Sequence, residues 1–179
     1  MAGGEGRDGL VKARLLILLL VVGVAVLAAQ AVKFQRDAAR LSAGQTAGAE
    51  AVAAARAYVP DLLSYDYRTI DDDLARAAGH ATGPLAGHFR QLAAALVPRA
   101  REEQKVQQAV VAAAGVESAT PDLVRVLVFV NMTTTRSQSG KDLPRQEVTQ
   151  NRARLVMVRT EAGWRVSDLS TLLGDTPTR

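Results

Sequence analysis

The spacing of hydrophobic residues changes twice along this chain, which divides it into three regions. Residues 15–32 form a continuous apolar run, LLILLLVVGVAVLAAQAV, in which Gln30 is the one polar residue. As a helix this run would be about 27 Å long, enough to cross the hydrocarbon core of a bilayer. We therefore predict a transmembrane helix over residues 15–32, preceded by a short cytoplasmic tail of residues 1–14.

The same run is open to a second interpretation, a cleaved secretory signal peptide. Ala29-Gln30-Ala31 fits the small-x-small pattern of a cleavage site, whereas the length of the run and the basic residues after it favour an uncleaved signal anchor. Basic residues flank both ends almost equally, so the charge rule barely decides the orientation. The short tail and the long following domain favour a single pass through the plasma membrane, with the C-terminal domain extracytoplasmic.

Residues 33–104 have the three- and four-residue spacing of amphipathic helices. We predict a juxtamembrane helical linker over residues 33–44, followed by helices over 45–63, 69–79 and 83–104. Pro60 is expected to bend or break the helix that contains it. The triplet Asp71–Asp73 lies where the first turn of a helix favours negative charge, which indicates helix capping.

Residues 105–172 alternate between apolar and polar positions and predict antiparallel strands. The expected strands are 105–118, 123–136, 147–160 and 164–169. One face of the first is expected to carry Val106, Val110, Ala112, Ala114 and Val116. The centre of 123–136 is apolar at consecutive positions, which predicts a central strand that is covered on both sides or lies at an interface.

Helices followed by strands indicate an α+β domain, in which N-terminal helices pack on a curled antiparallel sheet. Cystatin-like and nuclear-transport-factor-2-like domains have this order of elements and the shape of a cone. We expect this extracytoplasmic domain over residues 45–172, followed by a tail, residues 173–179. The fold by itself does not specify a function, because such folds host enzymes, binders and scaffolds.

Composition narrows the possible chemistry. The chain has no cysteine, which excludes a disulfide framework, a thiolate zinc site and a lipoprotein anchor. Its basic residues are dispersed and aromatic residues are only 4%, so we expect no nucleic-acid binding. His80 and His88 lack a carboxylate cluster that would complete a metal site. We expect no metal, no cofactor and no catalytic residues.

Two motifs are candidates for a functional site. In Ser64-Tyr65-Asp66-Tyr67, the residues Tyr65, Asp66 and Tyr67 could supply an oxyanion donor and a base, or the rings could fill the space between helices and sheet. In the segment Asn131–Thr135, the residues Asn131, Thr133 and Thr135 could satisfy backbone groups at a strand end, or form a polar edge that a partner contacts.

The chain resembles the actinobacterial Mce-associated membrane proteins, which accompany lipid-import systems named for mammalian cell entry. The resemblance covers roughly residues 10–172 and is carried by four segments: 62–69, Asp73-Leu74, 129–135 and 164–169. Met132 stands where relatives are expected to have glutamine. The resemblance implies a non-enzymatic accessory subunit that assembles or stabilises an Mce transport complex, with its N-terminus in the cytoplasm.

Two functions follow as hypotheses. The first is a membrane-anchored scaffold whose partners are the membrane, the protein subunits of an Mce complex and possibly lipid. The alternative is a lipid- or steroid-binding cone, possibly an isomerase- or dehydratase-like enzyme that uses Tyr65, Asp66 and Tyr67. An open cavity above about 300 Å³ lined by all three side chains would favour the alternative.

Overall fold

The protein is described here by a computed structural model, which covers residues 5–137 and 145–172, with side chains for residues 23, 27–137 and 145–170. The chain divides into two compact units, residues 1–42 and residues 43–179. The elements in chain order are α1 (Glu5–Leu63), β1 (Tyr65–Asp66), α2 (Ile70–His80), α3 (Gly83–Glu102), β2 (Val106–Ala119), β3 (Leu123–Arg136), β4 (Arg145–Thr160) and β5 (Gly163–Leu172).

Helix α1 belongs to both units. In the first unit, the described side chains of Leu27, Phe34 and Leu41 are 68%, 76% and 71% exposed. In the second unit, a four-residue repeat of small residues forms a fully buried stripe: Ala47, Ala51, Ala55 and Val59. Of the predicted bend or break at Pro60, the break is wrong, because the helix continues for three residues beyond it. Proline lacks the N–H that would bond to the carbonyl of Arg56, so one helical hydrogen bond is missing here.

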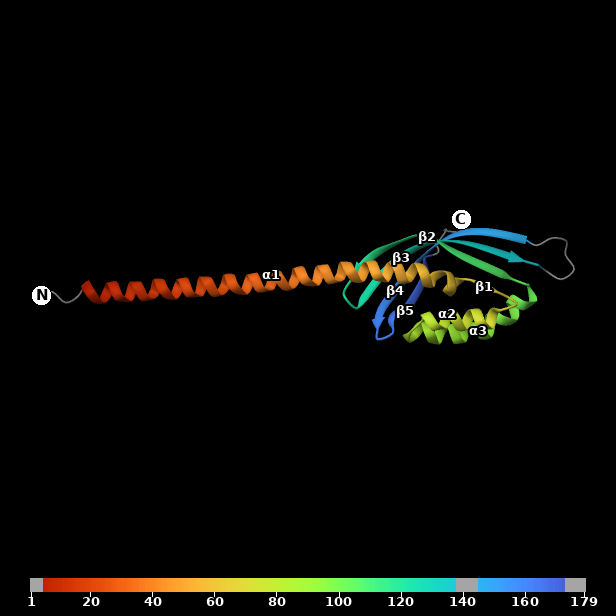
Figure 1. Cartoon of the computed structure of the whole chain (residues 1–179), viewed down its shortest axis with the longest axis horizontal. Coiled ribbons are helices and arrows are strands. Elements are labelled where there is room, and N and C mark those ends of the chain that lie inside the picture. Colours follow the sequence, from red (N-terminus) through yellow and green to blue (C-terminus); the bar gives the residue numbers. More distant parts are fainter. Residues whose placement is uncertain (1–4, 138–144, 173–179) are drawn as a thin grey trace, which may run out of the picture. The chain divides into compact units, whose positions relative to one another are not determined.

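A single antiparallel sheet, in the order β1-β2-β3-β4-β5, forms the second layer of the second unit (Figure 1). The central position predicted for residues 123–136 is confirmed, since β3 lies between β2 and β4. Every second residue of β3 faces the helices and is almost completely buried: Val124, Val126, Val128 and Val130. Helices α2 and α3 lie against each other, and α3 contacts β5. The predicted α+β class, with helices on a curled antiparallel sheet, is confirmed.

The opposite face of the sheet, called the outer face below, differs from the prediction. Phe129 and Leu123 point away from the helices and are 42% and 36% exposed. Of the two predicted alternatives, cover on both faces is not seen in the described part of the chain, and a position at an interface stays a prediction. The apolar centre of β3 reflects one buried face and one open face.

Strand β2 contains two irregularities that the alternating pattern did not reveal. Its register with β3 shifts between Val111 and Ala113, and again between Val116 and Ser118. Each β-bulge adds one residue to the strand and reverses the side to which the following side chains point. Val110 therefore lies on the outer face and Ala114 on the inner face, so the prediction that they share a face is wrong. The short strand β1 was also not predicted.

Parts of the predicted organisation fall outside the described residues. These are residues 1–4, the polar segment 138–144, the tail residues 173–179 and most side chains of the predicted transmembrane segment 15–32. The described residues contain no helix with the length and apolar character needed to span a membrane.

Candidate functional site

The motif with two tyrosines forms a corner between α1 and α2, and we call residues 61–80 the tyrosine corner. Strand β1 pairs with the start of β2, so that Tyr65 lies opposite Gln107 and Asp66 opposite Val106. The edge of β2 is closed by two further bonds. The backbone N–H of Ala109 donates to Ser64 Oγ at 3.0 Å, and Gln107 Nε2 donates to the carbonyl of Leu63 at 2.7 Å.

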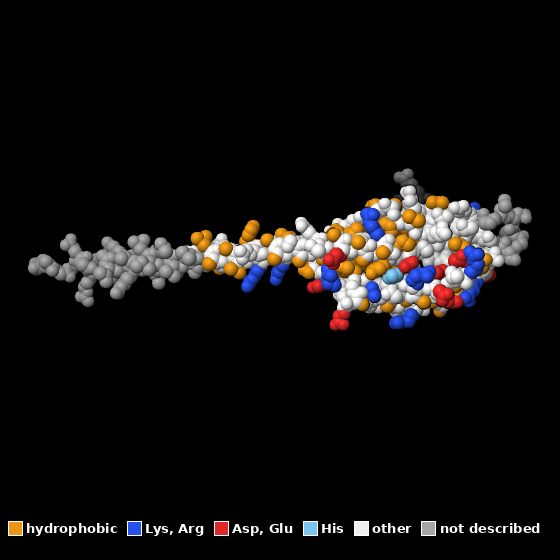
Figure 2. All heavy atoms as spheres, viewed as in Figure 1, with side chains coloured by type: hydrophobic (Ala, Val, Ile, Leu, Met, Phe, Trp, Pro, Cys, Tyr) orange, Lys and Arg blue, Asp and Glu red, His pale blue; other side chains and the backbone are white. Residues whose placement is uncertain are grey.

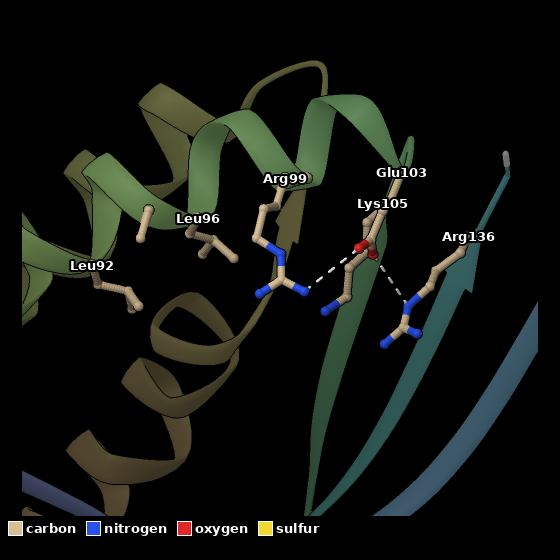
Figure 3. Close-up of a pocket in the computed structure, with 8 residues that line it drawn as sticks. Leu92, Leu96, Arg99, Glu103, Lys105 and Arg136 are labelled. Carbon is tan, nitrogen blue, oxygen red and sulfur yellow. Dashed lines mark ion pairs between the residues drawn. The ribbon is translucent and has the colours of Figure 1, made fainter. Parts of the chain in front are cut away.

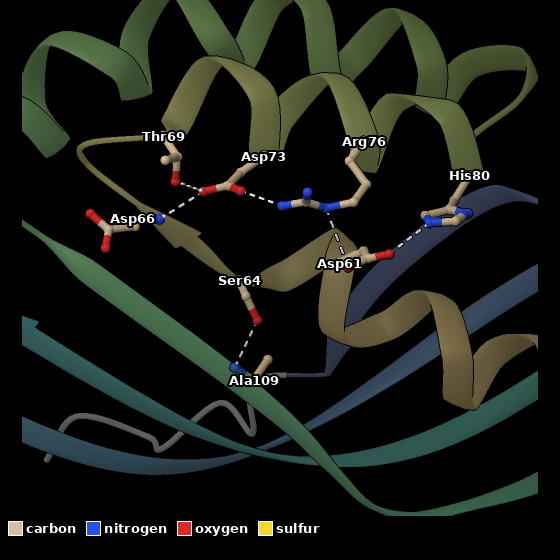
Figure 4. A network of polar contacts seen from close by, with 8 residues as sticks. All are labelled: Asp61, Ser64, Asp66, Thr69, Asp73, Arg76, His80 and Ala109. Carbon is tan, nitrogen blue, oxygen red and sulfur yellow. Dashed lines mark hydrogen bonds and ion pairs between the residues drawn. The ribbon is translucent and has the colours of Figure 1, made fainter.

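Asp73 is the centre of the tyrosine corner (Figure 4). It is 8% exposed and is the one buried charged residue among those described. One carboxylate oxygen accepts from the backbone N–H of Asp66 at 2.9 Å and from the Thr69 hydroxyl at 3.0 Å. The other accepts from Arg76. A buried carboxylate with this many donors fixes the backbone on both sides of the turn.

The polar network continues from Arg76 to α1 (Figure 4). Arg76 Nε lies 3.5 Å from Asp61 Oδ1, and Asp61 Oδ2 lies 2.9 Å from His80 Nε2. The His80 ring stacks on the Tyr58 ring with centroids 4.3 Å apart. These contacts join the end of α1 to the whole length of α2. In these contacts, acidic and basic side chains of the corner pair with one another.

The three candidate residues of the motif do not converge. Tyr65 is 8% exposed, with Lys105 Nζ 5.5 Å from its ring centroid. Asp66 is bound by the guanidinium of Arg68, with Nε–Oδ1 and Nη2–Oδ2 distances of 2.9 and 2.5 Å. These hydrogen bonds lower the pKa of the Asp66 carboxyl below its ordinary value. Tyr67 is half-buried, with Arg68 5.6 Å from its ring centroid.

A cleft of about 220 Å³ opens beside the tyrosine corner, and its lining includes Tyr65 and Asp66 but not Tyr67. It is smaller than the volume stated above for a catalytic or ligand-binding cone. The geometry therefore supports a packing role for the tyrosines more than acid–base chemistry. No group of three or more His, Asp or Glu residues in the described ranges is arranged to hold a metal ion.

The burial of Asp73 could have been predicted from its spacing relative to the apolar residues of α2, but we treated Asp71–Asp73 as one acidic group. Asp71 to Asp73 all lie in the first turn of α2, as predicted, but they differ in role. The buried stripe of α2 consists of Ile70, Asp73, Leu74 and Ala77, which have the spacing of one helix face. Asp73 is the member of the triplet that falls on this stripe. Asp71 is exposed and pairs with Arg101 at 2.5 Å.

The second motif lies on the outer face of the sheet. Asn131, Thr133 and Thr135 alternate with the buried valines of β3 and point away from the helices. The register aligns them with residues of β2 and β4 to form three rows. The rows are Val106–Thr135–Gln146, Gln108–Thr133–Val148 and Val110–Asn131–Gln150, and we call these nine residues the uncharged patch.

All nine residues of the uncharged patch are exposed or half-buried. Val110 and Val148 are 63% and 66% exposed, and Phe129 lies in the next row along β3. Asp66 pairs with Val106, so the Asp66–Arg68 ion pair borders the patch. The structure thus brings Asp66 near the strand-end residues, on the same face of the sheet. Tyr65 points to the core instead.

The rest of the described surface is different in character. Figure 2 shows acidic and basic side chains interspersed over helices α2 and α3. On the sheet, Arg154 forms a two-bond contact with Glu117, at 2.6 and 2.7 Å. Arg159 pairs with Glu50 at 2.6 Å and stacks on Trp164. Trp164 is 6% exposed and belongs to the core.

Sequence comparison assigns the chain to a family. The family model described as uncharacterized protein Rv1363c/MT1408-like matches residues 10–168, and the chain belongs to this family. Outer membrane protein Rv1973 of Mycobacterium tuberculosis is 38% identical over 130 residues, which cover 72% of this chain and 75% of that protein. Uncharacterized protein Rv1362c of the same organism is 31% identical over 118 residues, 65% of this chain; the match spans about half of that relative, 52%.

Solved structures show the same fold at low sequence identity. An IcmL-like type IV secretion system protein of Legionella pneumophila matches 73% of this chain and 96% of its own, with a TM-score of 0.54 and 12% identity. CagV, a VirB8 homologue of Helicobacter pylori, matches 69% and 96% respectively, with a TM-score of 0.53 and 12% identity. At these identities the likeness establishes a shared α+β fold.

Proposed function

We propose that this protein is a membrane-anchored, non-enzymatic accessory subunit that assembles or stabilises an Mce-type lipid transport complex in the cell envelope. The observation that carries the proposal is the uncharged patch, an open, partly apolar surface on the central strands of an otherwise charged domain. On the water-exposed surface of a protein, such a patch is typical of a contact with another protein. Asn131, Thr133 and Thr135 are its central column.

The sequence resemblance and the fold support this proposal. The resemblance to the Mce-associated proteins is carried by residues 62–69, Asp73-Leu74, 129–135 and 164–169. The structural neighbours named above are components of type IV secretion systems, which are multi-protein assemblies. In this chain the polar groups of the tyrosine corner that line the 220 Å³ cleft are bound to one another. A scaffold needs that kind of rigid support, whereas an enzyme needs groups that are free to react.

The patch is too small to hold a partner alone. Three strands spaced about 4.8 Å apart and about 20 Å of strand length give about 300 Å². A stable interface needs about 800 Å² on each partner. Anchoring both proteins in the same membrane would raise their effective concentration and offset the difference.

The proposed anchor is residues 15–32, with the N-terminus in the cytoplasm and the domain of residues 45–172 outside. Leu27, which lies in this segment, supports an apolar environment for it, since its side chain is 68% exposed. The intact mass of the mature protein decides between an anchor and a signal peptide. A chain that retains residues 1–31 and sediments with membranes agrees with the anchor; one that begins after Ala31 contradicts it.

Affinity purification of the full chain from mild detergent tests the proposed partner. Thr133→Lys places a charge at the centre of the uncharged patch, and Ser118→Lys places the same charge on the outer face near the other end of β2. Mass spectrometry should identify Mce-system subunits with the wild type and with the Ser118 variant, but not with the Thr133 variant. Recovery of the protein alone, or equal recovery with both variants, would contradict the proposal.

A further inference from the structure

A second cleft, on the helix side of the sheet, has a composition that the proposed scaffold role does not use. Its volume is about 270 Å³, and it lies between the C-terminal half of α3 and the adjoining ends of β2 and β3. Figure 3 shows Arg99, Lys105 and Arg136 directed towards the same space, with Leu92 and Leu96 further along the same side of α3. We call it the basic cleft.

The charges of the basic cleft are not balanced. Its lining contains three cations and a single carboxylate, Glu103. Glu103 lies 3.9 Å from Arg99 Nη2 and 3.6 Å from Arg136 Nε, at the outer limit of an ion pair. Lys105 has no carboxylate partner among the described residues. Two other arginines of the described part are held more closely by carboxylates, in the pairs Arg154–Glu117 and Arg159–Glu50, both at 2.6 Å.

Three cations that share a single carboxylate repel one another, and a bound anion would relieve that repulsion. The C-terminus of α3 contributes about half a negative charge, which leaves the cleft positive by more than one unit. Guanidinium groups bind carboxylate and phosphate through paired hydrogen bonds, and Arg99 and Arg136 have donors available for such bonds. The charge and the donor type both favour an anionic oxygen group.

The backbone holds these groups in place. Lys105 N–H donates to the carbonyl of Ala100 at 2.8 Å and Gln104 N–H to that of Arg101 at 3.3 Å, which together close the end of α3 in a Schellman motif. Gln104 has a φ of 44°, a left-handed conformation that glycine adopts more easily. This turn places Glu103 and Lys105 next to each other in the lining, between Arg99 and Arg136 (Figure 3).

The other half of the lining is apolar. Leu92 and Leu96 are one turn apart on α3, and Leu92 is 37% exposed. An anion of inorganic type would use the cations and leave these leucines uncovered. We propose that the basic cleft binds a single-chain amphiphile with a carboxylate or phosphate head group. The head group contacts Arg99, Lys105 and Arg136, and the first part of the chain lies on Leu92 and Leu96.

Calorimetry on the full chain in neutral phosphatidylcholine nanodiscs, with empty nanodiscs subtracted, tests this site. Octanoate should bind about tenfold more tightly than hexanoate, because each added methylene on an apolar surface contributes about a three- to fourfold gain. Octanol lacks the charge and inorganic phosphate lacks the chain, so each should bind at least tenfold more weakly than octanoate. Equal binding of octanol and octanoate, or no binding of octanoate, would overturn the proposal.

Substitutions of Arg136 and Glu103 should change the affinity for octanoate in opposite directions. Arg136→Gln should weaken octanoate binding at least fivefold, whereas Arg90→Gln, an exposed arginine of α3 outside the cleft, should leave it within twofold. Glu103→Gln removes the competing carboxylate and should tighten binding at least threefold. A purely structural role for Glu103 predicts no gain, so weaker binding by this variant would overturn the proposal.

Hydrogen exchange distinguishes the two sources of such an anion. Protection of residues 99–106 by octanoate alone would indicate a free amphiphile. Protection only when phosphatidylglycerol replaces phosphatidylcholine in the nanodisc, and not with octanoate, would indicate the head group of a two-chain membrane lipid and would overturn the single-chain ligand. Absence of protection in both conditions would overturn the proposal. The site is independent of the uncharged patch, so loss of octanoate binding in Arg136→Gln with unchanged partner recovery separates it from the proposed scaffold function.

Discussion

The tyrosine corner and the uncharged patch border each other at Asp66 and Val106, yet they are built in opposite ways. In the corner, Asp73, Arg76, Asp61 and His80 are bonded to one another and to the backbone. In the patch, polar and apolar side chains stand exposed without charge. Groups that bind each other maintain the fold, whereas groups left open can contact a partner. The tyrosine corner therefore stabilises the fold, whereas the uncharged patch offers a surface for contact.

The largest expected effect is the removal of the buried carboxylate. Asp73→Ala leaves the Asp66 N–H, the Thr69 hydroxyl and Arg76 without their acceptor and should lower the free energy of unfolding by about 3 kcal/mol. Urea unfolding of the full chain measures it. Asp72→Ala, on the exposed side of the same turn, is the matched control and should cost less than about 0.5 kcal/mol. Equal effects of the two changes would remove the distinction between corner and surface.

The next largest expected effect is a gain in stability. A more stable chain would make the difference between Asp73→Ala and Asp72→Ala easier to measure. Gln104→Gly relieves the left-handed conformation at the end of α3 and should raise the free energy of unfolding by about 0.5–1 kcal/mol. The cost of glycine in the unfolded chain is already included in this figure. The same urea measurement applies. A loss of stability would show that the Gln104 side chain contributes more than its backbone conformation costs.

Acid should destabilise the corner and the Glu50 contact but not the patch. Hydrogen bonds from Arg159 and Trp164 lower the pKa of Glu50, and those from Arg68 lower the pKa of Asp66. A lowered folded-state pKa confers stability that is fully present above the unfolded value, about 4, and is lost as pH falls through the folded value. At pH values below about 4, the melting temperature should therefore decrease. Glu50→Gln should reduce this slope, and an unchanged slope would contradict the role of Glu50.

The smallest effect on stability belongs to the patch. Thr133→Lys should change the free energy of unfolding by less than about 0.5 kcal/mol, because the side chain points away from the core on an open face. The same variant should lose its partner in the purification described above. If it instead unfolds the domain, the patch is part of the fold and the contrast with the tyrosine corner fails.

Periodicity predicted most of the fold. The buried stripe of α1 and the limits of β3 follow directly from residue spacing, because each element buries one face and leaves the other in water. The pattern failed where geometry departs from a fixed period. The bulges of β2 insert residues without a glycine or proline to mark them. Strand β1 has only two residues, too few for any periodicity.

The candidate site was predicted in part. Asn131, Thr133 and Thr135 were identified as one edge, since alternation alone places them on the same face. Their neighbours Gln108, Val148 and Gln150 could not be predicted, because register is set by pairing across strands that are distant in sequence. The same holds for the basic cleft, in which Arg99 and Arg136 come from separate elements.

The two bulges of β2 have a consequence for how this domain tolerates changes in length. Because Ala112 is the extra residue of the first bulge, its loss would remove the bulge and leave Val111 opposite Val130 and Ala113 opposite Phe129. The pairing of residues 106–111 with β3, and of Gln107 with Tyr65, would be kept. The pairing of β3 with β4 has no such register shift, so a deletion of one codon at the centre of β3 would exchange inward for outward side chains over half a strand.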